Sequence, residues 1–294
     1  MFISLSIFLN LSIRYESSNY QWLPAEFHVD DKGKVSIKSK INNLPTNHEK
    51  KMVKLIEELF EECVPELNKC YIFCKDIKFP SGDVGEDEEH KKGVQFKKPL
   101  KKCLYGETLQ VITKIVEYEL QPGQVHPDGA WHVEGMSHEN IICTAVTVLK
   151  KYPLLRGGGL RFKRAFTGEE ACEKIFFGVP QCRQKWVEDV IEEGIIELGR
   201  CNTNKYETVV FPNSHIHQLS EIKNHCSEMT RTRRVIVFWL INPNKRIIST
   251  ADIKDCSNEK IGILEALKHR LKLMEERKKY KQDWNIREIS LCEH

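Results

Sequence analysis

Arg233-Arg234-Val235-Ile236-Val237-Phe238-Trp239-Leu240-Ile241 is the strongest structural signal in this chain. Its apolar residues are mostly β-branched or aromatic, and such residues favour a β-strand. An arginine at the start of a buried strand is costly to desolvate unless an anion pairs with it. The stretch therefore predicts a buried strand that begins beside a charge in need of a partner.

Other β-rich runs lie on the N-terminal side of this stretch, and glycine- or proline-containing segments separate them. They cover residues 109–120, 141–149, 159–164 and 207–211. Two further segments, at 48–69 and at about 258–283, repeat apolar residues every three or four positions and so predict amphipathic helices. The predicted fold class is mainly β with flanking helices (α+β).

The same patterns predict one domain over residues 15–294, preceded by a short leader at 1–14. Within it we expect a helical flank at 48–69, a charged loop at 75–103, a β core at about 104–255 and a C-terminal helix at about 258–283. The charged loop carries an acidic run followed by a lysine-rich run, which is typical of a solvated segment. Docking of a charged partner there is the less favoured interpretation.

Composition narrows the class of protein. The chain has 294 residues, a net charge of +3 and no basic, aromatic-rich patch, so no nucleic-acid partner is expected. Its 11 cysteines are irregularly spaced without a CxxC pair, which predicts reduced thiols. The apolar segment 1–13 is too short to span a membrane and lacks a basic start. We therefore expect no membrane association and a cytoplasmic or nuclear location, with secretion disfavoured.

Two separate segments offer metal ligands. In Trp131-His132-Val133-Glu134, alternation along a strand would place His132 and Glu134 on one face. His217 lies far along the chain and could return from another strand, although His215 shares its strand face and competes for the role. Two imidazoles and one carboxylate can hold Fe(II) on one side and leave the other positions open. We therefore predict His132, Glu134 and His217 as metal ligands and catalytic residues.

Arg233 is the candidate for binding an acidic co-substrate beside that metal. Its planar guanidinium can bind a carboxylate through two donors. Arg231 and Arg234 are rivals, but Arg234 falls on the opposite strand face and Arg231 is farther from the apolar run. The combination indicates an iron oxygenase that uses 2-oxoglutarate and O2.

Other readings of the same residues remain open. His215, His217 and Glu221 form an HxH-x3-E pattern that partly matches a cupin motif, which would indicate a metal enzyme that does not use 2-oxoglutarate. A non-catalytic β-helix module that binds a partner is the third alternative. Trp131, Asn213 and Trp239 are candidate pocket residues, with core packing favoured for the tryptophans. The sequence does not indicate the oligomeric state, or whether the substrate is a small molecule or a protein side chain.

Several uncommon strings occur together in the order found in one family. They are Gln21-Trp22-Leu23-Pro24, Lys40-Ile41-Asn42-Asn43-Leu44, Trp131-His132-Val133-Glu134-Gly135-Met136, Phe211-Pro212-Asn213, Arg246-Ile247-Ile248-Ser249-Thr250-Ala251-Asp252 and Leu291-Cys292-Glu293-His294. Over roughly residues 15–294 the chain resembles the family named domain of unknown function 4246.

That family resembles the 2-oxoglutarate/Fe(II)-dependent dioxygenases. The resemblance implies a double-stranded β-helix core of the jelly-roll, cupin-like type. It also implies that His217 rather than His215 is the ligand and that Arg233 binds the 2-oxoglutarate carboxylate. The wider oxygenase pattern has HxD where this chain has HxE, so the carboxylate at Glu134 is one methylene longer.

Overall fold

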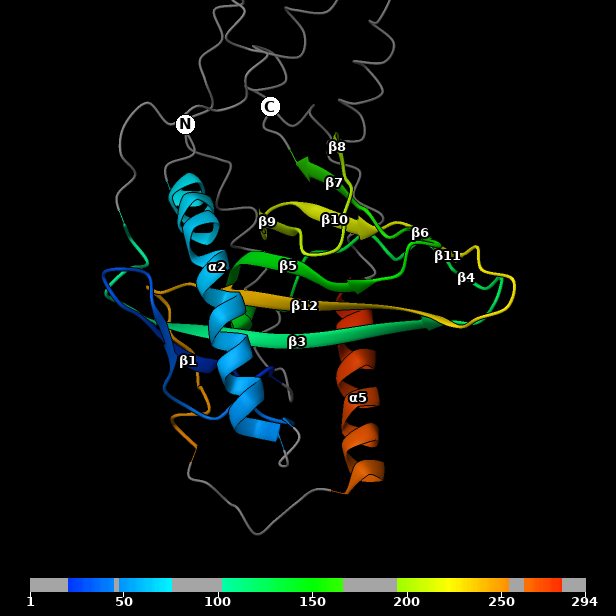
Figure 1. The fold of residues 1–294 in the computed structure, drawn as a ribbon. Helices are drawn as coiled ribbons and strands as arrows, with labels where there is room; N and C mark the ends of the chain where they lie inside the picture. The colour runs from blue at the N-terminus through cyan, green and yellow to red at the C-terminus, as the bar shows by residue number, and fades with distance from the viewer. Residues whose placement is uncertain (1–20, 45–47, 76–101, 166–194, 254–261, 282–294) are drawn as a thin grey trace, which may run out of the picture.

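The computed structural model describes residues 21–44, 48–75, 102–165, 195–253 and 262–281, and these form a mostly β fold with few helices and antiparallel sheets (Figure 1). The strands are β1 (Ala25–Val29), β2 (Val35–Ile37), β3 (Thr108–Leu120), β4 (Val125–His126), β5 (Ile141–Lys151), β6 (Leu155–Gly157), β7 (Leu160–Ala165), β8 (Ile195–Cys201), β9 (Thr208–Pro212), β10 (Ile216–Leu219), β11 (Ile222–Asn224) and β12 (Arg231–Ile241). The helices are α2 (Glu49–Lys75), α5 (Ile263–Lys281) and the 3₁₀ turn η4 (Ser137–Glu139).

The largest sheet, here called the main sheet, has six strands in the order β2-β1-β3-β12-β5-β9. β12 contains the apolar run 235–241 and pairs in antiparallel fashion with β3 on one side and β5 on the other. Because β12 is internal to the sheet and both of its faces are covered, a continuous apolar run suits this position. The strand begins earlier than predicted, at Arg231, so Arg233 lies inside it.

One face of the main sheet, here called the α2 face, packs against α2 (Figure 1). Phe60 from the helix lies between Phe27 and Phe238 of the sheet, with ring centroids 4.9 and 5.1 Å away. We predicted that this helix would end near residue 69, but it continues through Pro65 to Lys75. A proline inside a helix removes one backbone hydrogen bond. Burial of Leu67 and Tyr71 beyond it offsets that loss.

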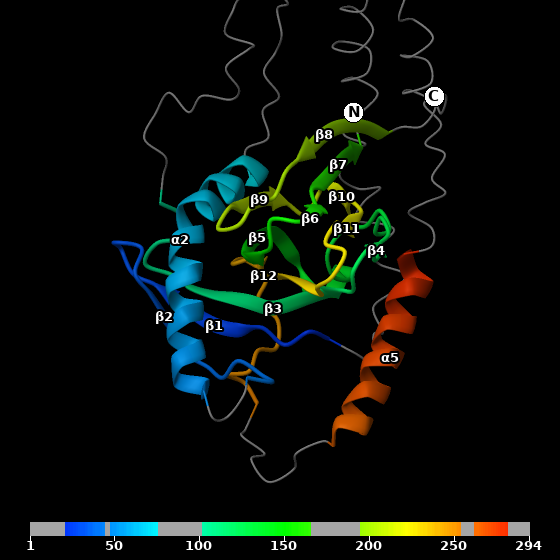
Figure 2. The same ribbon diagram turned by 45° about the vertical axis from the view of Figure 1, so that its right-hand side comes forward.

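The opposite face, here called the inner face, is covered by two three-stranded sheets, β10-β7-β8 and β4-β11-β6. Figure 2 shows α2 on one side of the main sheet and these small sheets on the other. Phe162 of β7 packs edge-on against Phe211 of β9, with ring centroids 5.0 Å apart, and joins the sheets at one end. The candidate site lies between these layers.

The five strands predicted from apolar runs are confirmed as β3, β5, β7, β9 and β12. The other seven strands of the described residues were not marked by an apolar run. The expected start of the β core at residue 104 was wrong, because β1 and β2 pair into the main sheet before that point. The leader 1–14 and nearly all of the charged loop, residues 76–101, lie outside the described residues.

The structure describes the predicted C-terminal helix over Ile263–Lys281, and the flanking segments 254–261 and 282–294 lie outside the described residues. Three of the leucines that suggested its buried stripe are exposed: Leu264, Leu267 and Leu271. Across the described part of the chain, no helix combines the length and apolar character needed to cross a bilayer. Six cysteines whose side chains are described are free, and only Cys63 and Cys143 of these are buried.

Candidate metal centre

His217 and His132 come from different parts of the chain and meet through their backbones. His217 lies on β10, which pairs with β7. The His132 N–H donates to the His217 carbonyl at 3.0 Å, and the His217 N–H donates back at 2.9 Å. This isolated bridge corrects our prediction that His132-Val133-Glu134 forms a strand. The rings lie on one side of the bridge, with centroids 4.4 Å apart.

Glu134 is placed by a turn rather than by strand alternation. The Asn213 side chain accepts from the Glu134 N–H at 2.8 Å and donates to the Glu134 carbonyl at 2.9 Å. Gly135 follows with φ +69°, and a Cβ there would lie 2.5 Å from the Ile141 side chain. A larger residue would therefore strain this turn. Asn213, a candidate for lining the pocket or for supporting a metal ligand, fixes the backbone that carries the carboxylate.

The ligand atoms of His132, Glu134 and His217 lie within 4.8 Å of one another. Glu134 Oε1 is 3.2 Å from His217 Nε2 and 3.8 Å from His132 Nε2. No other group of three such side chains occurs in the described segments. The sequence prediction thus named the three residues that the fold brings together, and their convergence depends on two segments that are 83 residues apart.

In both histidines the Nδ1 atom faces a backbone carbonyl, which leaves Nε2 for metal binding. His132 Nδ1 lies 2.8 Å from the Ala130 carbonyl, and His217 Nδ1 lies 3.4 Å from the His215 carbonyl. A carbonyl only accepts, so each Nδ1 carries a proton; each Nε2 donates to Glu134 when it is protonated and offers a lone pair to a metal when it is not. Metal-bound histidines commonly have this arrangement. Two neutral imidazoles and one carboxylate therefore form a donor set that fits a divalent transition metal.

Electrostatics keep Glu134 ionised. Burial by itself raises the pKa of the Glu134 carboxyl, but hydrogen bonds and charge interactions with His132 and His217 outweigh it and hold the pKa well below its usual range. A permanently charged carboxylate is the form that a cation requires. His217 is buried while His132 is partly exposed, so the cluster is open on the His132 side.

Arg233 is buried on the inner face with a guanidinium that is only partly satisfied. Its Nη2 donates to the Gly158 carbonyl at 3.0 Å and to Thr203 Oγ1 at 2.9 Å. Its Nε is buried and has no hydrogen-bond partner. Burial lowers the Arg233 pKa, and no carboxylate in the described residues pairs with it. An anion bound here would satisfy the free donors.

Gly158 allows the chain to pass closely over this guanidinium. A Cβ at Gly158 would lie 3.2 Å from Arg233 Cζ and Nε, and the residue has φ +75°. Thr203, which follows β8, donates its hydroxyl to the Gly158 carbonyl at 2.6 Å. The same hydroxyl accepts from Arg233 Nη2, so Thr203 links Gly158 to the guanidinium. Sequence reasoning did not select Thr203, because no local pattern marks a lone threonine in a connection.

Tyr118 is a second residue that sequence reasoning missed. It is the cross-strand partner of Arg233 on β3, and its ring centroid lies 5.8 Å from Arg233 Cζ. Burial raises the Tyr118 pKa, the Arg233 charge lowers it and the Glu134 charge raises it. The charges of both Arg233 and Glu134 therefore act on this phenol. The His126 ring packs edge-on against it, with centroids 5.1 Å apart.

The rival candidates lie elsewhere. Arg234 is exposed and forms an ion pair with Glu117. Arg231 Nη2 donates to Cys226 Sγ at 3.8 Å, and Arg231 Cζ lies over the Tyr152 ring, 5.1 Å from its centroid. Neither arginine joins the metal cluster, and Arg233 alone of the three is buried beneath the inner-face layers.

The structure also shows where the residues of the cupin-type ligand set and the two candidate tryptophans lie. His215 precedes β10 rather than sharing its strand face with His217, and Glu221 lies beyond β10; neither joins the cluster. Trp131 has Lys163 Nζ 4.7 Å from its ring centroid. Trp239 is buried on the inner face, 6.5 Å from the ring of Trp22.

The comparison with protein families gives one clear result. The family described as "Protein of unknown function (DUF4246)" matches residues 5–102 and 75–255, which together span most of the chain. The chain therefore belongs to this family. No curated protein matches it.

Similarity to solved structures is weak. A bsmA homolog from Methylobium petroleophilum PM1 is 13% identical with a TM-score of 0.29, over 47% of this chain and 42% of that one. Oxalate oxidase is 13% identical with a TM-score of 0.19, over 57% of this chain and 63% of that one. The polyketide cyclase RemF from Streptomyces resistomycificus is 12% identical with a TM-score of 0.16, over 46% and 65%. These TM-scores are too low to assign an activity.

Proposed function

We propose that this protein is an Fe(II)- and 2-oxoglutarate-dependent dioxygenase built on a double-stranded β-helix core. The observation that carries the proposal is the convergence of His132, Glu134 and His217 on one point, with both Nδ1 atoms already hydrogen-bonded. These residues would hold Fe(II). Contact of the main sheet with the sheet β10-β7-β8, through Phe211 against Phe162 and His217, supports such a core.

Arg233 supports the co-substrate part of the proposal. It is a buried cation with unused donors and no carboxylate partner in the described segments. It would bind the carboxylate of 2-oxoglutarate that is remote from the metal, and Thr203 would hold the guanidinium in the orientation required. Tyr118 would offer its hydroxyl from the neighbouring strand, in its neutral form because burial raises its pKa.

The chemistry supplied by Fe(II), 2-oxoglutarate and O2 in such a site is oxidation of an organic substrate, coupled to conversion of 2-oxoglutarate to succinate and CO2. The protein's own contribution is to position these groups and exclude water. Inner-face residues Val146, Val235 and Val237 form an apolar wall for this purpose. The partly exposed side of His132 is where a substrate would approach. The substrate itself is either a small molecule or a protein side chain.

An anaerobic titration tests the proposal. Fe(II) and then 2-oxoglutarate are added to the full chain while visible absorbance is recorded, and a weak charge-transfer band is expected only when both are present. His132→Ala should abolish the band, whereas His215→Ala should leave it intact, because His215 lies outside the cluster. A full-strength band in His132→Ala would contradict the ligand assignment.

The same experiment separates the alternatives. Fe(II) binding without a band or succinate formation would favour a metal enzyme that does not use 2-oxoglutarate. Absence of metal binding would favour a non-catalytic module. Succinate release on exposure to air measures the reaction directly, and its loss in Arg233→Met at low 2-oxoglutarate concentration is expected.

A further inference from the structure

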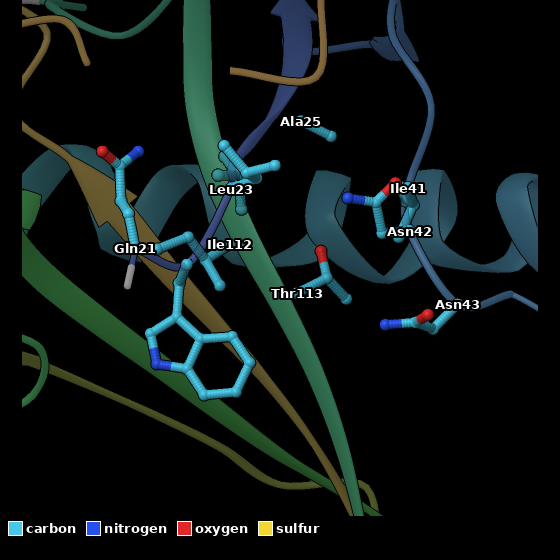
Figure 3. Close-up of a pocket in the computed structure, with 10 residues that line it drawn as sticks. Gln21, Leu23, Ala25, Ile41, Asn42, Asn43, Ile112 and Thr113 are labelled. Atoms are coloured by element: carbon cyan, nitrogen blue, oxygen red, sulfur yellow. The ribbon is translucent and has the colours of Figure 1, made fainter. Parts of the chain in front are cut away.

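A pocket of about 200 Å³ lies at the edge of the main sheet, among residues that take no part in the proposed metal centre. Its walls include Trp22, Leu23, Asn42, Asn43, Ile112 and Thr113 (Figure 3). The first two residues precede β1, the asparagines follow β2, and the last two belong to β3. The pocket is therefore built where three segments separate from one another.

The separation lies at the start of β1, where Ala25 is opposite Val111. β1 pairs with β3 only through Ala25–His28 and Thr108–Val111, while β3 continues to Leu120. Pro24, which precedes β1, has no N–H to donate to the sheet and so ends the pairing. Beyond Val111, no described strand pairs with β3 on this side. The pocket thus contains the first stretch of an open strand edge, whose backbone groups are available to an added segment.

Three polar side chains of the pocket have no hydrogen-bond partner in the described residues, whereas Gln21 Nε2 donates to the Ile248 carbonyl at 3.0 Å. Thr113 Oγ1 is buried and makes no hydrogen bond. The carboxamides of Asn42 and Asn43 have no hydrogen-bond partner within the described part of the chain. Figure 3 shows both amide groups pointing toward Thr113 across the pocket. By contrast, the nearby Gln110 side chain is fully occupied with Glu26 and Ile247.

The unpartnered groups define the chemistry of a ligand. Thr113 Oγ1 is a buried polar atom without a partner, which is unusual in proteins, and a ligand that completes it removes the cost; Asn42 and Asn43 are exposed and offer their amides from the rim of the pocket. A carboxamide or hydroxyl can both donate and accept. None of the residues that line the pocket is charged, so a neutral ligand is favoured over an acid or a cation. Trp22 and Ile112 add an apolar wall beside these groups.

We propose that this pocket binds a neutral peptide segment in an extended conformation, which adds to the edge of β3 where β1 leaves it. One amide of the segment meets Thr113 and the two asparagines, and a small apolar side chain packs against Trp22. Strand addition to an open edge is an established mode of peptide recognition. The proposal does not depend on iron or 2-oxoglutarate binding, so either can fail without the other.

The test uses the metal-free full chain and a blocked peptide, N-acetyl-valyl-alanyl-valine N-methylamide, followed by amide NMR shifts. Saturable shifts at Ile112 and Thr113 are expected at millimolar peptide. Replacing the central amide by an ester keeps the shape but removes one donor, and should weaken binding about fivefold. Methyl glucoside serves as a neutral, non-peptide probe and should not bind.

Variants locate the site. Thr113→Val should weaken peptide binding about fivefold without lowering the melting temperature, because the hydroxyl it removes has no partner in the free protein. Asn42→Ala should act in the same direction. Thr232→Val, on β12 and outside the pocket, is the matched control and should leave binding unchanged. Absence of shifts at β3, equal binding of the ester or of methyl glucoside, or unchanged affinity in Thr113→Val would each overturn the proposal.

Discussion

The two faces of the main sheet are built from the same strands but differ in what they leave unsatisfied. On the α2 face, Phe60 and Phe238 are fully buried and Thr147 is hydrogen-bonded to Thr208, and the unsatisfied hydroxyl of Thr113, opposite Phe238, belongs to the pocket at the strand edge. On the inner face, Thr144 and Trp239 are buried with polar atoms that have no partner, and Arg233 has a free Nε. The α2 face therefore carries most of the stabilising packing, while the inner face holds groups suited to a ligand.

The difference follows from strand alternation. Neighbouring residues on β12 point to opposite faces, so Phe238 contributes to the core and Trp239 to the inner face. A substitution on one face should thus alter stability, and a substitution one residue away should alter binding. The comparison can be tested with changes to each face, and the expected effects range from several kcal/mol to about one.

Phe60→Ala should produce the largest effect. The ring contacts Phe27 and Phe238 at the centre of the α2 face, and its removal leaves a cavity. We expect the free energy of unfolding to fall by about 3–5 kcal/mol, measured by urea denaturation. Fe(II) affinity per folded molecule should be unchanged. A large loss of affinity with little loss of stability would show that the two faces are coupled.

Arg233→Met should act on binding. Loss of charged hydrogen bonds of about 2–3 kcal/mol predicts a 2-oxoglutarate affinity lower by roughly 30- to 150-fold, measured by calorimetry in the presence of Fe(II). Stability should change little, because the buried guanidinium is only partly satisfied in the free protein. Arg234→Met, one residue away on the opposite face, is the control. Equal weakening by both variants would contradict the assignment of Arg233.

Strand alternation also explains which parts of the fold the sequence revealed. The runs 141–149 and 235–241 form long strands that are largely buried between neighbours on both sides, and the run 109–120 forms the long strand β3, which is buried at its start, so composition alone marks all three. β4 and β11 have two and three residues; β4 pairs with β11, and β11 also pairs with β6. No local pattern can indicate a strand that is stabilised entirely by a distant partner.

The candidate site was likewise predictable only where local sequence carries the signal. His132, Glu134 and His217 could be named because few residue types bind metals, and the family resemblance selected His217 over His215. The geometry that unites them could not be predicted, since it depends on a backbone bridge and on the Asn213 side chain. Tyr118 was hidden because its position depends on the register of β3 against β12.

Glu26 lies on the side of β1 that belongs to the inner face, and its carboxyl should make the stability of the protein depend on pH. Burial raises the pKa of Glu26, but hydrogen bonds from Arg246, Ser249 and Gln110 outweigh it and lower the pKa below 4.5. A lowered folded-state pKa stabilises the protein above the unfolded value, and this contribution is lost as pH falls through the folded value. Glu26→Gln should cost about 1–2 kcal/mol at neutral pH and flatten the acid side of the stability curve. An unchanged acid slope, in urea titrations at several pH values, would contradict this.

The smallest effect provides the closest comparison, because it concerns two threonines three residues apart on β5. Thr144 and Thr147 are both buried, but only Thr147 has a hydrogen-bond partner, Thr208 at 2.8 Å. Valine has nearly the same shape as threonine, so replacement tests the hydroxyl alone. Thr147→Val should lose about 1 kcal/mol of stability, whereas Thr144→Val should lose nothing or gain up to about 1 kcal/mol, because it removes an unsatisfied group. Equal losses in the two variants, measured by urea denaturation, would mean that the Thr144 hydroxyl is satisfied in solution, and the inner face would then no longer differ from the α2 face at this position.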